Sequence, residues 1–418
     1  MEKITLIHEV HDMWPSTLKE IGGFSENNPF IRILQKAENS AYQKSDAVVS
    51  IPPYAEKYMT EHGLAKGKFI CIPNGIVEED WNHAEELPND IKAELEKLHN
   101  HGKFIVGYFG GHALSNALDI LLDCIKLFTK YENIVFVLVG DGSEKKRLVQ
   151  RSKDEKIQNI LFFNSIKKRA IPNLLKHFDC IYIGTHKSPL YRFGLGMNKI
   201  YDAMMAGKPI VLSATVPGSI VEEYNCGIVV PADDITKIKD AIITIYSISD
   251  EKRRELGENG KKAVKENFLY DKLAHDFEYK MQHTGEKRIL LINHYAGSPD
   301  MGMEFRPYYF AKEWIKSGYK VDIIAADYSH LRIKNPKIKK DFETENVDGI
   351  QYHWIHTGTY DGNGIRRALT MFQFVWKLWI NAKKIAKKYK PNVIITSSTY
   401  PLDTYAGQRI KKYVRGQF

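Results

Sequence analysis

Hydrophobic runs alternate with amphipathic stretches along most of this chain, and the alternation predicts an α/β fold. Residues 104–109, 134–139 and 180–183 are short apolar runs bounded by glycine or polar residues, as buried strands are. Stretches of helical spacing, such as residues 114–131, separate these runs. A regular order of strand and helix predicts a parallel, doubly wound sheet.

The two ends of the chain carry a second set of strand-like runs. A polar, linker-like stretch at residues 282–287 precedes the last part of this set. Each end supplies about half of the strands that a Rossmann-like domain needs. The predicted strands are residues 4–10, 46–51, 68–72, 288–295, 321–325, 349–354 and 393–397.

Residues 194–209, GLGMNKIYDAMMAGKP, hold the strongest candidate for a binding site. Asn198 stands where an N-cap is expected, and Gly207 suits the end of the helix. The free N–H groups of such a helix start, with further donors from Asn198 and Lys199, are suited to a diphosphate. Asp202 lies one turn on, where its carboxylate can accept hydrogen bonds from ribose hydroxyls. The alternative is a helix that covers the sheet and whose Asp202 is solvated.

Two glycine turns after neighbouring strands could complete this site. Gly110 and Gly111, followed by His112, come between a strand and a helix, so their amides can approach a phosphate closely. Gly140 and Asp141 form a similar turn at the end of the next strand. Tight packing of strand on helix explains the first turn equally, and a helix-capping turn explains the second.

Four polar residues are candidates for the chemistry. Arg192 and Lys199 are predicted to stabilise the charge of a departing diphosphate. His11 and Asp12 follow a strand near the start of the chain, where either could hydrogen-bond a sugar or accept a proton. The alternatives are solvated loop charges for the first pair, and a buried histidine beside a capping aspartate for the second.

Residues 194–209 resemble the nucleotide-sugar motif of retaining GT-B glycosyltransferases of family 4, particularly the WbuB-like branch. Many members of this family carry two glutamates eight positions apart, whereas this chain has Gly194 and Asp202 at those places. The resemblance implies GT-B architecture: two Rossmann-like, doubly wound parallel-sheet domains that face each other across a cleft. It also places Gly140 and Asp141 beside the nucleoside of the donor.

Two further stretches resemble the WbuB-like branch, but in an exchanged order. Residues 297–309, GSPDMGMEFRPYY, look like the start of such an enzyme, and residues 8–15, HEVHDMWP, look like its middle. The native order would then be 286–418 followed by 1–282, which makes the chain a circular permutant. The alternative is a complete, shorter enzyme followed by an unrelated fragment. In the first stretch, the resemblance places four residues on the acceptor side: Gly297, Gly302, Glu304 and Arg306.

The permuted order divides the acceptor-side domain between the two ends of the chain. Residues 77–265 would form the donor nucleotide-sugar domain, and 266–285 the crossover helix and linker. Residues 286–418 and 1–76 would form the first and second halves of the acceptor-side domain.

The resemblance also implies the activity: transfer of a hexosyl or N-acetylhexosaminyl group, with retention, from a nucleotide-diphosphate sugar to a lipid-linked or cell-surface glycan. It implies no cofactor and no metal. A non-hydrolysing nucleotide-sugar epimerase and an inactive sugar-nucleotide-binding scaffold remain alternatives.

Composition and motifs narrow the class further. The chain of 418 residues has a net charge of +9, which suits an anionic ligand or surface, and no nucleic-acid partner is predicted. It carries no Asp-x-Asp element after a strand, no G-x-G-x-x-G, no P-loop and no zinc pattern, and its four cysteines form no CxxC pair. Without a targeting signal or an apolar run of about 18 residues, it is predicted to be cytoplasmic.

Residues 366–390 carry aromatic residues followed by lysines. They form either part of the core or a peripheral contact with the inner face of the membrane.

Overall fold

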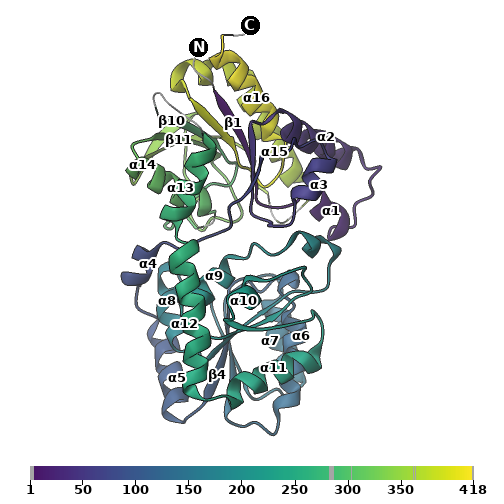
Figure 1. The fold of residues 1–418 in the computed structure, drawn as a ribbon, viewed down its shortest axis with the longest axis vertical. Helices are drawn as coiled ribbons and strands as arrows, with labels where there is room; N and C mark the ends of the chain where they lie inside the picture. The colour runs from purple at the N-terminus through teal and green to yellow at the C-terminus, as the bar shows by residue number, and fades with distance from the viewer. Residues whose placement is uncertain (1–3, 282–286, 303, 361, 363, 417–418) are drawn as a thin grey trace. The chain divides into compact units, whose positions relative to one another are not determined.

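The computed structural model describes residues 4–281, 287–302, 304–360, 362 and 364–416, which form two compact α/β units (Figure 1). Unit 1 comprises Met1–Pro73 and Tyr270–Phe418, and unit 2 comprises Asn74–Leu269. Unit 1 is therefore formed by two separate segments of the chain, and unit 2 is formed by the segment between them. The boundaries lie a few residues from the predicted ones at 76 and 265, and the predicted crossover helix forms within unit 1 as α13 (Tyr270–Met281).

Unit 2 is built on a sheet whose described strands are all parallel, in the order β6-β5-β4-β7-β8-β9. This is the doubly wound order in which the chain reverses direction between β4 and β7, and ligands bind at that reversal. The strands are β4 (Phe104–Phe109), β5 (Ile134–Val139), β6 (Ile160–Phe163), β7 (Cys180–Gly184), β8 (Ile210–Ser213) and β9 (Gly227–Val230). The helices are α4 (Glu78–Asn82), α5 (Asn89–Asn100), α6 (Leu118–Ile125), α7 (Lys145–Asp154), α8 (Ile171–Lys176), α9 (Asn198–Met205), α10 (Ile220–Glu223), α11 (Ile235–Ser247) and α12 (Asp250–Asn267).

The helix predicted over residues 114–131 is interrupted. A 3₁₀ turn spans Leu114–Asn116, α6 follows, and a second 3₁₀ turn spans Lys126–Phe128. Ala117 separates the first turn from α6 with a positive φ of 47°. The apolar spacing predicts the buried face correctly, but it carries no signal for a single left-handed residue.

Unit 1 contains a sheet of eight strands within the described residues, in the order β12-β13-β11-β10-β14-β1-β2-β3. Neighbours are parallel except β12 and β13, which form a hairpin. Sequence reasoning missed β12, because this edge strand reads ETENV and is mostly exposed. The strands are β1 (Thr5–Val10), β2 (Ala47–Ser50), β3 (Phe69–Cys71), β10 (Arg288–Ile292), β11 (Lys320–Ala326), β12 (Glu343–Val347), β13 (Ile350–Ile355) and β14 (Val393–Thr396).

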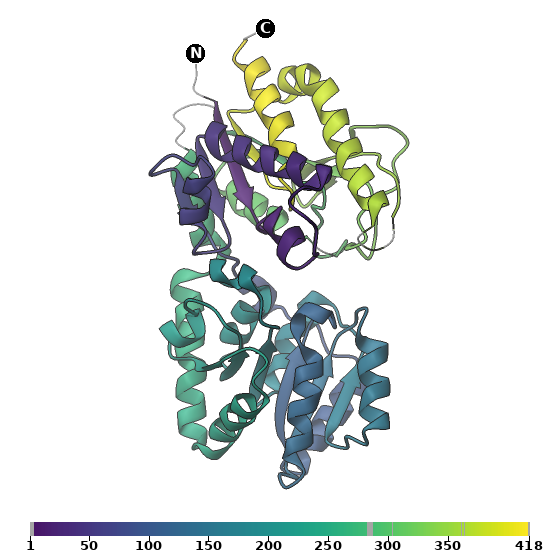
Figure 2. The ribbon, with the colours of Figure 1, turned by 90° about the vertical axis from the view of Figure 1, so that its right-hand side faces the viewer.

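The head and the tail of the chain share this sheet. β1 lies between β14 and β2: Ile7 aligns with Ile395 on one side and with Ala47 on the other. The Thr5 N–H donates to the Asn392 carbonyl at 2.9 Å. Read from β10, the strands follow the same doubly wound order as in unit 2, with the reversal between β10 and β14. In Figures 1 and 2, the start of β1 and the end of the last helix lie at the same end of unit 1.

Helices cover both faces of the unit 1 sheet. One face packs Leu6, Leu290 and Ile394 against Phe374 and Ile410 of the last two helices. On the other side, α13 packs on α14 through an aromatic cluster of Phe277, Phe310 and Trp314. Within the described ranges no helix is long and apolar enough to cross a membrane. The remaining helices are α1 (Ser16–Glu20), α2 (Pro29–Lys44), α3 (Glu56–Glu61), α14 (Arg306–Lys316), α15 (Ile365–Tyr389) and α16 (Asp403–Val414).

Candidate functional site

The strand reversal of unit 2 brings Lys199 to the glycine turn after β4. The Lys199 ammonium donates to Asn116 Oδ1 at 2.7 Å and to the Tyr108 hydroxyl at 3.1 Å. Tyr108 in turn donates to the Gly111 carbonyl at 2.6 Å. Gly110 has a φ of 117°, and a Cβ there would lie 3.6 Å from Lys199 Nζ. A Cβ on Gly111 would meet open space, so its backbone is accessible to a ligand.

The charge on Lys199 has no carboxylate among its hydrogen-bond partners in the described chain, since both partners are neutral oxygens. Desolvation lowers the pKa of Lys199 to about 7. A lysine held in this way is prepared to receive an anion, because an anion would supply the counter-charge that the protein does not.

The turn after β5 packs directly against the turn after β4. Its Gly140 has a φ of 158°, and a Cβ there would lie only 1.9 Å from the Gly110 carbonyl oxygen. The His112 N–H donates to the Asp141 carbonyl at 2.7 Å, and the Asp141 side chain is exposed. Glycine is therefore required at position 140 for backbone to pack on backbone.

His112 is buried between these turns. Within the described structure, neither of its ring nitrogens has a hydrogen-bond partner. Burial, with the nearby Lys145 charge, lowers the pKa of His112 to about 4, so its imidazole is neutral at physiological pH.

The start of α9 differs from the prediction. Asn198 is the first helical residue and Met197 occupies the N-cap, so the predicted N-cap is wrong by one position. Both carboxylate oxygens of Asp202 accept from the Lys168 ammonium at 2.7 Å. The Asp202 side chain is buried, and its role towards a ribose stays a prediction.

The loop before α9 is held by Asn74, which sequence reasoning did not select. The Asn74 side-chain amide donates to the Gly196 carbonyl at 2.6 Å. Gly194 has a φ of 87°, a backbone conformation that favours glycine at this position. Arg192 is exposed; its guanidinium donates to the Pro189 carbonyl at 2.7 Å and lies over the Phe193 ring.

A second polar cluster lies at the strand reversal of unit 1. His11, just after β1, contacts Glu304 Oε1 through Nδ1 at 2.9 Å and Glu9 Oε2 through Nε2 at 3.2 Å. The Ser397 hydroxyl, just after β14, donates to Glu9 Oε2 at 2.6 Å. Asp12, next to His11, is exposed. The head and the tail of the chain therefore build this cluster together.

The two carboxylates keep His11 protonated. Burial alone would lower its pKa, but Glu304 and Glu9 outweigh burial and raise it to about 10. The imidazolium has both nitrogens engaged and no lone pair available. This finding corrects the prediction that His11 could accept a proton, and it leaves Asp12 as the candidate for that role.

Arg306 lies in the interior of unit 1. Its guanidinium donates to Glu9 Oε1 at 2.8 Å, to the Pro73 carbonyl at 2.6 Å and to the Ile72 carbonyl at 2.8 Å. Only 3% of the residue is exposed. Arg306 therefore joins β1, the end of β3 and α14, and we assign it a structural role in place of the predicted role on the acceptor side.

The glycine loop on the predicted acceptor side is largely internal. The Gly297 N–H donates to the Glu304 carbonyl at 3.1 Å, and the Gly297 carbonyl accepts from the Tyr352 hydroxyl at 2.7 Å. Gly302 has a φ of 89°, and a Cβ there would lie 2.9 Å from the Ile333 nitrogen. The loop thus positions Glu304 beside His11 by its backbone.

The structure adds site residues that single-sequence reasoning did not select. They share one property: each contacts a residue that lies far away in the sequence and that only the fold brings close. They are Glu9, Asn74, Tyr108, Asn116, Lys168 and Ser397. Among the described residues, no group of three His, Cys, Asp or Glu side chains is placed to hold a metal ion.

Most of unit 2 is similar to a known protein family. Residues 90–263 match the family described as "Glycosyl transferases group 1". The uncharacterized glycosyltransferase MJ1069 of Methanocaldococcus jannaschii is 26% identical over 241 residues, which are 57% of this chain and 58% of that protein. The chain thus spans somewhat more than half the length of this relative.

Two solved structures share the fold. Alr3699/HepE of Anabaena, in complex with UDP and glucose, superposes with a TM-score of 0.52 at 19% identity, covering 67% of this chain and 72% of its own. WaaG, a glycosyltransferase involved in lipopolysaccharide biosynthesis, gives a TM-score of 0.51 at 13% identity, covering 68% and 77%. The predicted GT-B fold with two doubly wound α/β domains is confirmed.

Proposed function

We propose that this protein is a glycosyltransferase that transfers a sugar from a nucleotide-diphosphate donor to a growing cell-surface glycan. One observation carries the proposal: the Lys199 ammonium lies beside the Gly110–Gly111 turn, at the strand reversal of a sheet that matches the group 1 glycosyltransferases. A strand reversal is where doubly wound sheets bind nucleotides. HepE, which shares the fold, binds UDP-glucose, and this supports a nucleotide-sugar donor here.

The chemistry that we assign to unit 2 is stabilisation of the leaving diphosphate. Lys199 provides a charge, and the Gly111 backbone provides an approach that no Cβ obstructs. We assign Arg192, on the loop before α9, a second positive charge towards the diphosphate. We assign Asp202 a contact with the ribose, which requires Lys168 to release one of the two carboxylate oxygens of Asp202. We propose that the Lys199 ammonium takes the place of a divalent metal ion and that transfer proceeds with retention.

Unit 1 is proposed to bind the acceptor. The His11 imidazolium is held between two carboxylates, so it supplies a fixed positive charge. Asp12, which is exposed, would accept the proton of the attacking hydroxyl. WaaG takes part in lipopolysaccharide biosynthesis, which supports a lipid-linked or cell-surface glycan as acceptor.

The first experiment is a thermal-shift screen with UDP, GDP, CDP and dTDP. A ligand that binds only the folded protein raises the midpoint by mass action, so one diphosphate should shift it selectively. The matching radiolabelled nucleotide sugars are then incubated with a polysaccharide-precursor extract, with and without EDTA. Transfer that EDTA does not inhibit is expected. Epimer formation, or binding without turnover, would refute the proposed activity.

We also infer that the chain is a circular permutant. Strand order supports the inference, because unit 1 follows the doubly wound order only when it is read from β10. A gene in which residues 286–418 precede residues 1–282 should encode a protein with the same diphosphate affinity and a similar midpoint of unfolding. A reordered protein that fails to fold would count against it.

A further inference from the structure

Helix α15 of unit 1 carries apolar side chains on two opposite faces. One face, with Phe374, Leu378 and Ile385, is buried in the core of the unit. The other face is open. It carries Ile365, Leu369, Phe372, Trp376 and Ile380, which are 81%, 60%, 38%, 62% and 55% exposed. These five recur at spacings of three and four, so they form one stripe along the helix.

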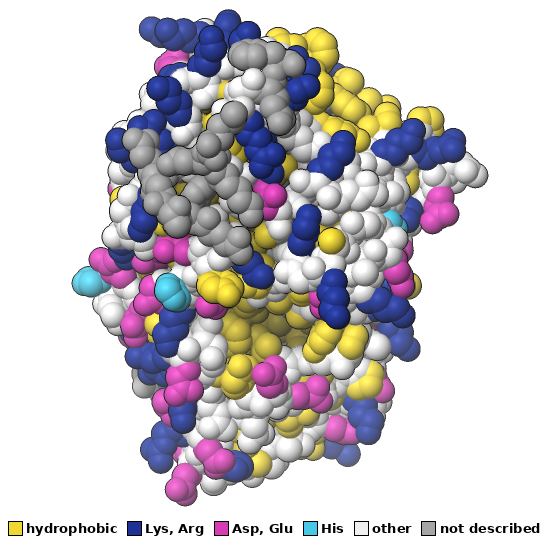
Figure 3. All heavy atoms as spheres, turned by 45° about the horizontal axis from the view of Figure 1, so that its top comes forward, with side chains coloured by type: hydrophobic (Ala, Val, Ile, Leu, Met, Phe, Trp, Pro, Cys, Tyr) yellow, Lys and Arg dark blue, Asp and Glu magenta, His cyan; other side chains and the backbone are white. Residues whose placement is uncertain are grey.

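The same stripe continues as positive charge. Lys383 and Lys387 follow Ile380 at helical spacing, and Lys384 and Lys388 flank them; all four are exposed. The 25 residues of α15 include no aspartate or glutamate. Figure 3 shows apolar side chains gathered at the upper right edge of the molecule, among Lys and Arg side chains.

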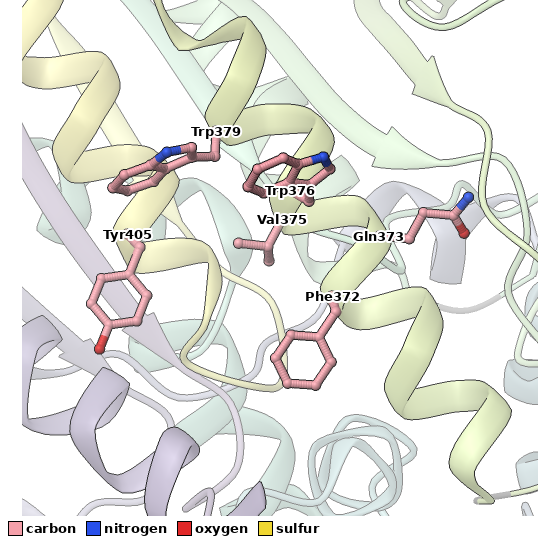
Figure 4. A pocket seen from close by; sticks show the side chains of 6 residues that line it. All are labelled: Phe372, Gln373, Val375, Trp376, Trp379 and Tyr405. Carbon is pink, nitrogen blue, oxygen red and sulfur yellow. The ribbon is translucent and has the colours of Figure 1, made fainter.

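A groove opens beside the stripe, between α15 and α16. Its volume is about 570 Å³, and Phe372, Trp376 and Trp379 line it together with Tyr405 of α16. Figure 4 shows the two indole rings and the Phe372 ring on α15, with the Tyr405 ring facing them from α16. The guanidinium of Arg409 lies 4.4 Å from the centre of the Trp379 ring, so a cation borders the groove as well.

We infer that this face of unit 1 docks on an anionic lipid bilayer, with α15 lying along the surface and the groove receiving an acyl chain. Tryptophan and tyrosine favour the boundary between headgroups and hydrocarbon, and lysines beside them reach anionic headgroups. From Ile365 to Lys387 the stripe is about 33 Å long at 1.5 Å per residue. Because the opposite face of α15 is packed on the core of unit 1, the stripe lies in the plane of the bilayer and does not cross it.

Charge decides between a bilayer and a second copy of this chain. An isologous dimer through α15 would bring the same acid-free, lysine-bearing helix from both copies together. An anionic bilayer neutralises these lysines instead. The inference concerns binding alone, so it does not rest on the proposed transfer activity.

The test is co-sedimentation of the full chain with vesicles of phosphatidylcholine, alone or with about one third phosphatidylglycerol. Binding at least about tenfold stronger to the anionic vesicles is expected, and it should weaken at high salt. Equal binding to both vesicles, or binding to neither, would overturn the inference.

Two matched pairs of variants locate the surface. Trp376→Ser with Ile380→Ser should reduce binding to anionic vesicles by about tenfold or more, whereas Tyr279→Ser with Ile333→Ser removes comparably exposed side chains elsewhere on unit 1 and should not. Lys384→Glu with Lys387→Glu should abolish the preference for anionic vesicles. Lys146→Glu with Lys153→Glu, on exposed positions of α7, should retain it.

The variants also separate the other occupants. Each protein is checked by its midpoint of thermal unfolding; if Trp376→Ser with Ile380→Ser does not fold, Ile365→Ser with Leu369→Ser takes its place. A dimer in solution that the stripe variants dissociate, without loss of vesicle binding, would assign the surface to a second copy and refute docking on the bilayer. If the stripe variants lose no more vesicle binding than the control variants do, docking through this surface is refuted as well.

Discussion

Replacing Lys199 with methionine tests the proposed diphosphate site most directly. The partners of the ammonium are the Tyr108 hydroxyl and Asn116 Oδ1, both neutral, so the change leaves no buried carboxylate unpaired. Stability should therefore change little. A charge-assisted hydrogen bond to a phosphate contributes about 1.5–3 kcal/mol, so the dissociation constant of the selected nucleoside diphosphate should rise about 10- to 150-fold.

The pH dependence gives a second, independent readout. The pKa of Lys199 in the free protein is lowered to about 7, and a bound diphosphate would raise it again. Binding above pH 7 then takes up a proton, so affinity is greatest below pH 7 and falls as the pH rises. Between pH 7 and 9 the dissociation constant should increase about 50-fold, since one group of pKa about 7 must be protonated. The ligand itself titrates near about pH 6, below this window.

Isothermal titration calorimetry at pH 7, 8 and 9, in two buffers of different ionisation enthalpy, measures both affinity and proton uptake. Lys208→Met is the matched control. Lys208 follows the far end of α9, donates to the Lys176 carbonyl at 3.0 Å and also has a pKa that burial lowers. It should bind like the wild type. A wild-type affinity that is constant from pH 7 to 9, or a Lys199→Met variant that binds normally, would refute the role of Lys199.

Three further changes test the structure around the two sites. Arg306→Met should lower the free energy of unfolding by about 3–5 kcal/mol in urea titrations, because it removes the guanidinium from the buried Glu9 carboxylate and leaves only the His11 imidazolium beside it. Adding Glu9→Gln should restore part of the loss, and independent, additive effects would contradict the pairing. His11 has a raised pKa in the folded state, so its contribution to stability is complete below about pH 6.5 and is lost as the pH rises through about 10. His11→Gln should flatten that decline in unfolding experiments at pH 7 and pH 10, and a decline as steep as in the wild type would exclude the ion pairs as its cause. Gly140→Ala should destabilise the protein by about 1–3 kcal/mol and weaken diphosphate binding, since its Cβ would meet the Gly110 carbonyl; unchanged thermal unfolding and calorimetric affinity would show that the two turns can separate freely.

The sequence predicted most of the strands because their apolar runs are continuous and bounded by turns. It missed β12, because the exposed sequence ETENV has no apolar pattern. It also predicted a continuous helix across Ala117, because alanine gives no indication of a left-handed backbone. Periodicity identifies buried positions but not the charges buried among them. Glu9 lies within a wholly buried strand, where Arg306, His11 and Ser397 contact its carboxylate.

The site was predicted in part for a similar reason. Glycine after a strand and lysine in the first turn of a helix indicate a candidate phosphate site by local chemistry, so Gly110 and Lys199 could be selected from the sequence. Their supports could not, because Tyr108 lies 91 residues from Lys199, and Lys168 lies 34 residues from Asp202. The protonation of His11 depends on Glu304, which is 293 residues away.

The shared sheet of unit 1 constrains how the protein is made. β1 needs β14 as its neighbour, and their paired residues His8 and Thr396 are 388 positions apart. At roughly 5–20 residues per second, ribosomes need about 20–80 s to span that interval. Throughout that time the nascent first strands have an open apolar edge, while unit 2, which is continuous in the chain, can fold. Rapid capture of this edge by a chaperone during translation should therefore matter more for this polypeptide than for one whose gene begins at β10.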